Sequence, residues 1–389
     1  MSESPLHVVS VQTTNEKGGG EYANVNLLEA LAQRGSRVKL LTNMPELADG
    51  TSVPTQQIDL GPKLSRRTVR RVVAGFAPGV VRLARALRRE AREAPIDVLL
   101  LHFKKEQLMG PLLPRGLVGA IVWAEWGPLP LPLRTGALRR AYALAARSAR
   151  LVLAVSDSTR ASLLDAGIPP RKVVVVPPLV DAGTIRFDAD ARERRRREWG
   201  VGAGTFVVGC ISRLHASKRN DVVIDALEHL PDDVILVIAG SGEDEAELRE
   251  RAERFGDRVR FLPTPRGYVH EILSACEVQV FAPQPLEGLP RAIIFGQLTE
   301  RPILVTEASK VTGLVPDGTG SSVEPANDPA ALAALLMEYR SDPERRAREG
   351  SAGRRFALER YDTQRATDQV DLRLRRVAGR ASPPRARVA

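Results

Sequence analysis

The chain has 389 residues and a formal net charge of +10; 43 % of the residues are hydrophobic and only 4 % are aromatic. This length exceeds what one hydrophobic core usually organises, so we expect two domains. No apolar run reaches eighteen residues, and the two cysteines, Cys210 and Cys276, stand in apolar surroundings without metal-ligand spacing. These features argue against a helical membrane span and a cysteine metal site, and they favour a reduced, cytoplasmic setting.

In the first half of the chain, apolar strand-like runs alternate with helical patterns. The expected strands cover residues 6–11, 37–42, 96–101, 119–123, 151–155 and 173–177. The expected helices cover residues 21–34 and 138–150, and a further helix opens at Ser156, whose hydroxyl suits an N-cap. Gly35 follows the first of these helices, where a residue with left-handed backbone is expected.

The second half repeats this alternation after a charged interruption at residues 181–204. The expected strands cover residues 206–211, 234–239, 259–262, 278–281 and 303–306, and the clearest helices cover 244–255 and 329–339. Continuous apolar strands separated by helices are typical of parallel sheets that are buried on both faces. The sequence therefore predicts an α/β fold of two doubly wound, Rossmann-like parallel-sheet domains that face each other across an inter-domain cleft.

The charged interruption predicts the domain boundary. We expect an N-terminal domain at residues 1–180 and a C-terminal domain at residues 181–362. A last helix at about 363–378 should pack back on the first domain, and the Pro- and Arg-rich tail at 379–389 should be disordered.

The positive charge is concentrated in residues 63–92, which contain ten Lys and Arg. Such a strip can meet the phosphate groups of a lipid, a nucleic acid or an acidic substrate. One interpretation is therefore peripheral membrane contact through this segment. The other is a solvated helix face in a protein that is rich in Arg throughout. Nucleic-acid binding is disfavoured, because no aromatic interleaving or recognition motif accompanies the charges.

Two cations follow the expected strand at residues 206–211. Arg213 and Lys218 stand in a short loop ahead of a helical stretch that begins near Asp221. Loops that follow parallel strands lie at the carboxyl edge of the sheet, where open α/β folds bind anionic ligands. We therefore expect both side chains at that edge, with a plain exposed basic loop as the alternative.

The stretch at residues 284–291 leads from an apolar strand through Glu287 and Gly288 into an apolar helix. This turn puts a carboxylate and backbone N–H groups at the carboxyl edge of the same sheet. The stretch resembles the signature of retaining nucleotide-sugar glycosyltransferases of family 4, which have the two-domain GT-B fold. That signature is a Glu, seven residues and a second Glu. Glu287 matches the first, whereas Phe295 stands where the second belongs.

The resemblance covers nearly the whole chain and implies how a nucleotide-sugar donor is bound. It implies that Arg213 and Lys218 grip the donor diphosphate, with Arg219 in place of the Gly that often follows the lysine. It implies that Glu287 binds hydroxyls of the sugar and acts in catalysis. In relatives the second Glu binds the ribose, which Phe295 cannot do by hydrogen bonding. The remaining donor contacts that it implies are Gly19 and Gly20 at a helix start, Gly240 in a Gly-x-Gly turn, and the backbone of Gly288 and Leu289.

The acceptor side is less determined. Relatives often carry a His after the strand that corresponds to residues 121–124, and here Glu125 is the polar group at that point, so we expect it to take part in catalysis. His102, which ends a strand, and Trp126 are candidates for binding the acceptor, as is Glu21. A lone His is more often structural, and the Trp could belong to the core instead of stacking on a ring.

The resemblance implies an enzyme that transfers a hexosyl-type sugar, with retention, from a nucleoside-diphosphate sugar to a natural product or a cell-envelope precursor. It implies no metal ion and no cofactor besides a UDP- or GDP-sugar co-substrate. The second interpretation is a catalytically weak GT-B protein that binds a sugar nucleotide or a partner without turnover. The basic segment as a nucleic-acid site ranks last.

Overall fold

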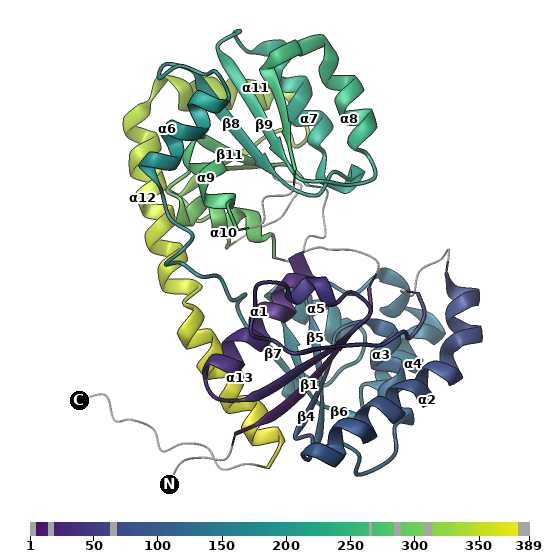
Figure 1. Cartoon of the computed structure of the whole chain (residues 1–389). Coiled ribbons are helices and arrows are strands. Elements are labelled where there is room, and N and C mark those ends of the chain that lie inside the picture. The colour runs from purple at the N-terminus through teal and green to yellow at the C-terminus, as the bar shows by residue number, and fades with distance from the viewer. Residues whose placement is uncertain are drawn as a thin grey trace. The chain divides into compact units, whose positions relative to one another are not determined.

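The computed structural model describes residues 5–14, 19–62, 68–263, 267–283, 289–306 and 313–379 (Figure 1). The chain divides into two compact units. Unit 1 consists of Met1–Leu179 and Gln364–Ala389, and unit 2 of Val180–Thr363. Each unit contains its own parallel sheet, and the chain returns to unit 1 after it completes unit 2.

Unit 1 is built on a sheet of seven parallel strands in the order β3-β2-β1-β4-β5-β6-β7. The strands β1 and β4 are buried along their whole length, as expected where helices cover both faces of a parallel sheet. The strands are β1 (His7–Gln12), β2 (Arg37–Thr42), β3 (Thr55–Gln57), β4 (Val98–Leu101), β5 (Ala120–Glu125), β6 (Ala149–Ala154) and β7 (Val173–Val175).

Two helical layers cover the sheet of unit 1. One face packs on α1 (Gly19–Gln33) and on α13 (Thr363–Val377), the segment that returns from unit 2. The alternate side chains of the same strands form a second core with the other four helices. These are α2 (Val69–Glu93), α3 (Lys104–Met109), α4 (Gly136–Ala145) and α5 (Asp157–Asp165).

Unit 2 is built on six parallel strands in the order β10-β9-β8-β11-β12-β13. The central strands β8, β9, β11 and β12 are almost wholly buried, again because both faces are covered. The strands are β8 (Phe206–Ile211), β9 (Val234–Ala239), β10 (Val259–Leu262), β11 (Val278–Phe281), β12 (Ile303–Thr306) and β13 (Gly320–Val323).

The helices of unit 2 also form two layers. On one face lie α7 (Asn220–Asp225), α8 (Glu245–Ala252) and α11 (Pro329–Ser341). On the other lie α9 (Val269–Ser274), α10 (Arg291–Leu298) and α12 (Pro343–Arg360), while α6 (Ala189–Glu198) packs against α9. Short 3₁₀ helices complete the two units: η1 (Pro45–Ala48), η2 (Gly110–Leu112), η3 (Leu131–Leu133), η4 (Pro170–Lys172), η5 (Ala216–Lys218), η6 (Ala226–His229) and η7 (Glu253–Arg258).

The two doubly wound parallel sheets predicted from the sequence are confirmed. One local expectation was wrong. The helix expected at 138–150 is too long, because α4 ends at Ala145 and Ala149 already pairs with Ile121 in the sheet. In the charged interruption at 181–204, for which no helix or strand was predicted, the structure has the helix α6, and Asp188 caps its N-terminus by accepting from the Ala191 N–H at 2.8 Å.

Several finer expectations can be compared directly. Gly35 has the expected left-handed backbone with a φ of +83°, and Ser156 caps α5 by accepting from the Thr159 N–H at 3.2 Å. Cys210 and Cys276 are buried free thiols, and burial raises the pKa of each to about 12. Among the helices that the structure describes, none combines the length and the apolar character that crossing a bilayer requires.

Candidate functional site

The strand order locates one candidate ligand site in each unit. In open α/β sheets, ligands bind outside the carboxyl ends of the strands, at the point where the strand order reverses. That point lies between β1 and β4 in unit 1 and between β8 and β11 in unit 2. The residues that follow these four strands are therefore best placed to meet a ligand.

Arg213 lies in the loop after β8, with 44 % of its side chain exposed. Its guanidinium donates to the carboxylate of Glu243 at 2.9 Å, and Glu243 also lies 3.2 Å from Nε2 of His215. Glu243 is itself 58 % exposed, and ion pairs between exposed side chains contribute only about 0–1 kcal/mol. Arg213 can therefore exchange this partner for an anionic ligand at low cost.

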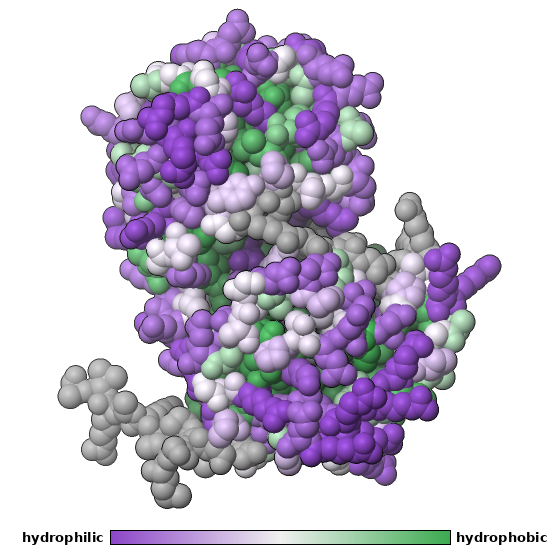
Figure 2. Space-filling model, in the orientation of Figure 1, coloured by the Kyte–Doolittle hydropathy of each residue, from purple (hydrophilic) through white to green (hydrophobic). Residues whose placement is uncertain are grey.

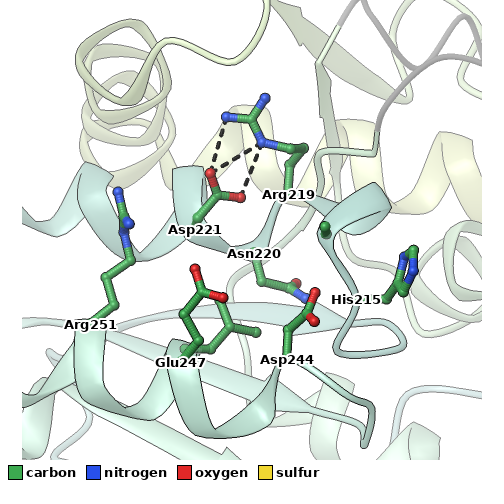
Figure 3. A pocket seen from close by; sticks show the side chains of 9 residues that line it. His215, Arg219, Asn220, Asp221, Asp244, Glu247 and Arg251 are labelled. Carbon is green, nitrogen blue, oxygen red and sulfur yellow. Dashed lines mark hydrogen bonds and ion pairs between the residues drawn. The ribbon is translucent and has the colours of Figure 1, made fainter.

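Lys218 ends the 3₁₀ helix η5, and its ammonium lies 5.7 Å from the centre of the Phe281 ring. Phe281 is the last residue of β11, so the lysine from the β8 loop reaches the end of the neighbouring strand. The next residue, Arg219, has a left-handed backbone with a φ of +48°, which costs most residues about 1–2 kcal/mol and glycine nothing. The guanidinium of Arg219 donates to Asp221 at 3.0 Å (Figure 3).

The glycines of the turn between β9 and α8 serve packing. A Cβ on Gly240 would lie 3.0 Å from the carbonyl carbon of Ser212 and closer still to its oxygen. A Cβ on Gly242 would lie 2.5 Å from the carbonyl carbon of Leu214 and again closer to its oxygen. Neither glycine has a positive φ, so each position requires the absence of a side chain. The donor contact expected of Gly240 stays a prediction.

The segment after β11 is only partly described. Glu287 and Gly288 lie outside the described residues, and their expected contacts stay predictions. Leu289 and Phe295 are half-buried against the core of unit 2. The Arg291 guanidinium lies 5.1 Å from the centre of the Phe295 ring, its Nε has no hydrogen-bond partner, and burial lowers its pKa to about 10. The Phe295 ring thus packs beneath the Arg291 guanidinium, and Arg291 forms no ion pair with any described residue.

In unit 1, Glu125 ends β5 and is only 3 % exposed. One carboxylate oxygen pairs with the ammonium of Lys104 at the start of α3. The other accepts hydrogen bonds from Gln107 and from the Tyr142 hydroxyl, each at 2.8 Å. Burial and the neighbouring carboxylate raise the pKa of Tyr142 well above its usual range. Both oxygens of Glu125 are thus occupied, and the group that solvent reaches is Lys104, whose side chain is 20 % exposed.

His102, at the end of β4, is held by hydrogen bonds on both ring nitrogens. The indole N–H of Trp126 donates to Nδ1 at 2.9 Å, so Nε2 carries the proton and donates to Ser10 Oγ at 3.0 Å. Ser10 in turn donates to Asn24 at 3.2 Å. Burial, together with the charge of Lys104, lowers the pKa of His102 to about 3. The ring therefore stays neutral between pH 5 and 8 and fixes the position of Trp126.

The N-terminus of α1 lies against the same group of residues. The helix begins at Gly19, and a Cβ on Gly20 would lie 3.1 Å from Cβ of Trp126. Glu21 is buried and accepts a hydrogen bond from the Thr14 hydroxyl at 3.3 Å. The sequence-predicted glycines and acceptor candidates are thus brought together at the carboxyl ends of β1, β4 and β5.

Sequence reasoning missed a buried charged pair at this edge. Glu106 is fully buried and accepts from Thr13, while its second carboxylate oxygen has no partner. Lys105 lies 3.7 Å from Glu106 and donates to the Gly61 carbonyl at 2.5 Å. Burial raises the pKa of Glu106 and lowers that of Lys105. The one sequence signal for this pair was the Lys-Lys-Glu run after a strand. The contacts themselves could not be predicted, because Thr13 is 93 residues from Glu106 and Gly61 is 44 residues from Lys105.

A pocket of about 220 Å³ opens beside the loop between β8 and α7 (Figure 3). Arg219 is neutralised there by Asp221, whereas Asp244 and Glu247 add carboxylates to the wall. Carboxylates repel a diphosphate, so this pocket is a poor site for one. Its lining consists of His215, Ala216, Arg219, Asn220, Asp221, Asp244, Glu247, Leu248 and Arg251. The part of the chain that the structure describes contains no group of three or more His, Cys, Asp or Glu that could hold a metal ion.

Two family models match the chain, one for each unit. The model described as Glycosyltransferase Family 4 matches residues 17–183, and the model described as Glycosyl transferases group 1 matches residues 191–356. Together they cover all strands of both sheets except β1, and every candidate residue that the sequence predicted.

Curated relatives and solved structures agree with these matches. The chain is 31 % identical over 271 residues to the GDP-mannose-dependent alpha-(1-6)-phosphatidylinositol monomannoside mannosyltransferase of Mycolicibacterium smegmatis, covering 65 % of this chain and 69 % of the relative. It is 28 % identical over 386 residues to the D-inositol 3-phosphate glycosyltransferase of Xylanimonas cellulosilytica, covering 90 % of this chain and 89 % of the relative. The crystal structure of Anabaena HepE in complex with UDP and glucose superposes with a TM-score of 0.78 at 20 % identity, covering 95 % of this chain and 99 % of that one.

Proposed function

Because the chain belongs to the family 4 glycosyltransferases of the GT-B fold, we propose that it transfers a hexosyl-type sugar, with retention and without a metal ion, from a nucleoside-diphosphate sugar to an acceptor hydroxyl. The observation that carries this proposal is the position of Lys218 over the end of β11, where the strand order of unit 2 reverses. The exposed Arg213 stands in the same loop.

These two cations suit the chemistry of the leaving group. A nucleoside diphosphate gains negative charge as the bond to the sugar breaks, and fixed cations stabilise that charge most strongly in the transition state. Arg213 and Lys218 would do the work that a divalent metal does elsewhere. Arg213 would exchange Glu243 for the diphosphate, which carries more negative charge than a single carboxylate.

On the acceptor side, we propose that Lys104 contacts the acceptor and that Glu125 acts as a positioning residue behind it. Glu125 is too enclosed to meet a substrate directly, but it fixes the Lys104 ammonium. Trp126, whose indole N–H is held by His102, would be a second contact for the acceptor. Relatives are named for inositol phosphate and phosphatidylinositol substrates, which favours a polyol phosphate or its lipid-linked form, a cell-envelope precursor, as the acceptor of this chain.

A second candidate function is a protein that binds a sugar nucleotide without turnover. Phe295 favours it, because an apolar ring stands where the family signature has a carboxylate and the contact to the ribose would be weaker. The cations for the leaving group are nevertheless retained, which is why we favour the enzyme.

The direct test of the proposed function is a titration of the full chain with UDP, GDP and their glucose and mannose derivatives, followed by turnover. We expect one nucleotide series to bind, and release of that nucleoside diphosphate when D-inositol 3-phosphate or phosphatidylinositol vesicles are added. The anomeric configuration of the product, read by NMR, should match that of the donor. Binding without turnover over the whole acceptor panel would favour the second candidate, and no nucleotide binding would contradict both.

Phe295→Glu should lower the KM for the donor about ten- to a hundredfold. A hydrogen bond to a charged acceptor is worth about 1.5–3 kcal/mol, and the restored carboxylate would accept from the ribose hydroxyls. The substitution should keep the fold, because the new charge would lie one helical turn from the Arg291 guanidinium, which now covers the ring.

The matched control is Phe295→Leu, which keeps an apolar side chain at the position. Its donor KM should stay within about threefold of the wild type. If Phe295→Glu is folded by circular dichroism and its donor KM is unchanged, the position no longer contacts the donor.

A further inference from the structure

The outward face of α2 carries seven arginines without counter-ions. All seven are exposed, and none forms an ion pair within the described residues. The two acidic residues of the helix, Glu90 and Glu93, point to β2, where Arg37 and Lys39 pair with them. The arginines are Arg70, Arg71, Arg82, Arg85, Arg88, Arg89 and Arg92. The remaining cations of the basic segment, at residues 63–67, lie outside the described residues.

Two other arginine-rich helices lack such a face. The helix α6 is even richer in arginine, and each of its five arginines has a carboxylate partner on Glu193, Glu198, Glu271 or Glu277. The same holds for the arginines of α8, which pair with Glu245 and Asp225. The arginines of α6 and α8 are thus paired, whereas the seven on α2 stand along one side of a single helix without an ion pair to any described residue.

Exposed apolar side chains accompany these charges. Among the described residues, seven large hydrophobic side chains are exposed, and six of them belong to α2, η2, η3 and α4. These elements lie on one side of the sheet of unit 1, where α3 contacts both α2 and α4. Figure 2 shows hydrophilic side chains crowded over α2 with apolar ones beside them. The six are Val73 (70 % exposed), Val81 (46 %), Leu112 (58 %), Leu131 (66 %), Leu138 (57 %) and Leu144 (61 %).

The helix α4 also combines exposed arginines with exposed leucines. It has no acidic residue, and its Arg139 and Arg140 are exposed beside Leu138 and Leu144. Seven arginines on α2 and two on α4 give nine cations, with no acidic side chain on these two helices left unpaired. We call α2, η2, η3 and α4 together the α2–α4 face.

We propose that the α2–α4 face binds the surface of a bilayer that contains anionic lipids. Arginines near such a surface are attracted to the lipid phosphates, and exposed leucines and valines bury their side chains at the boundary between head groups and acyl chains. A nucleic acid would be attracted by the charges, but it would give no energy to six aliphatic side chains, since stacking on bases needs aromatic rings. The proposal does not depend on the proposed transfer reaction.

The test is co-sedimentation of the full chain with two kinds of vesicle across a series of salt concentrations. One kind contains phosphatidylcholine alone, and in the other roughly one lipid in three is the anionic phosphatidylglycerol. We expect binding to the anionic vesicles, little binding to the neutral ones, and weaker binding as salt increases. The triple variant Arg85→Gln, Arg88→Gln, Arg89→Gln should bind about a hundredfold more weakly, since each arginine near the surface contributes about 1 kcal/mol.

A matched triple variant controls for net charge. Arg194→Gln, Arg197→Gln and Arg249→Gln remove the same three charges from exposed, paired positions of unit 2. Vesicle binding of this variant should change less than twofold. A third variant, Leu131→Ser with Leu138→Ser and Leu144→Ser, should also weaken vesicle binding and should leave the affinity for a short oligonucleotide unchanged.

Three results would overturn the proposal. Vesicle binding that is equally reduced by both arginine triples would mean that only net charge matters. Oligonucleotide binding in the absence of vesicle binding would assign the face to a nucleic acid. A concentration-dependent dimer that the three serine substitutions dissociate, again without vesicle binding, would assign it to a second copy of this chain.

Discussion

Lys218→Met should lower kcat/KM about 100- to 1,000-fold, which is the usual cost of removing one group that stabilises developing charge. Methionine keeps the length of the side chain and removes the ammonium that lies over Phe281. Because Lys218 is half-buried and stands in a loop, the melting temperature should change by no more than about 2 °C. Turnover at saturating donor, and not only the donor KM, should fall, since the diphosphate gains charge as the bond to the sugar breaks.

Arg213→Met should have a smaller effect in the same direction, because its guanidinium is exposed and must first leave Glu243. The control is Arg249→Met, which makes the same charge change on α8, where the arginine pairs with Glu245. Its kcat/KM should stay within about twofold of the wild type. If the kcat/KM of Lys218→Met and that of Arg213→Met also stay within about twofold of the wild type, the diphosphate is held by other groups.

The central strands of both sheets were predictable from the sequence for a simple physical reason. Parallel strands that helices cover on both faces must be apolar at successive positions, so β8 and β9 stand out as uninterrupted runs. The edge strands β3 and β13 have one neighbour each and the sequences Thr-Gln-Gln and Gly-Ser-Ser-Val. Nothing local marks them as strands, because their structure comes from pairing with β2 and β12.

For the candidate site, the sequence predicted where the functional residues lie in the fold better than it predicted which residues they contact. The loops after β8 and β4 could be assigned to the carboxyl edges of the sheets, because a strand pattern precedes each. The partners of Glu125 could not be predicted, because Lys104 and Tyr142 are 21 and 17 residues away in the sequence and meet Glu125 only in the folded chain. The same limit applies to His102, whose two ring nitrogens are hydrogen-bonded to Trp126 and Ser10.

The turn after β9 makes a close contact that the motif did not predict. The pattern Gly-x-Gly at residues 240–242 predicts close approach to a ligand, and the structure adds a close approach of both glycines to the backbone of the loop that carries Arg213. The Leu214 N–H donates to the Ser241 carbonyl at 3.0 Å, and the Asp244 N–H donates to the Leu214 carbonyl at 3.1 Å. The two loops therefore form one backbone-bonded unit, which no pattern within either loop shows.

Gly242→Ala should consequently destabilise unit 2 by about 3 kcal/mol. The added Cβ would lie 2.5 Å from the carbonyl carbon of Leu214 and 2.8 Å from its nitrogen. These are backbone atoms fixed by the hydrogen bonds just described, so they cannot move aside as the end of a flexible side chain would. For a domain of this size, such a loss corresponds to a fall in melting temperature of about 6–12 °C.

The matched control is Gly204→Ala in the same unit, where a Cβ would meet nothing within 4 Å and the φ is not positive. That variant should keep the melting temperature within about 2 °C of the wild type, because it changes neither packing nor backbone strain. Urea unfolding of both variants measures the difference. Since the loop that Gly242 supports also carries Arg213, the surviving folded fraction of Gly242→Ala should bind nucleotide more weakly, whereas Gly204→Ala should bind it normally. Equal stability of the two variants would mean that the loops after β8 and β9 can separate at little cost, and that the loop carrying Arg213 is not held in place by the turn after β9.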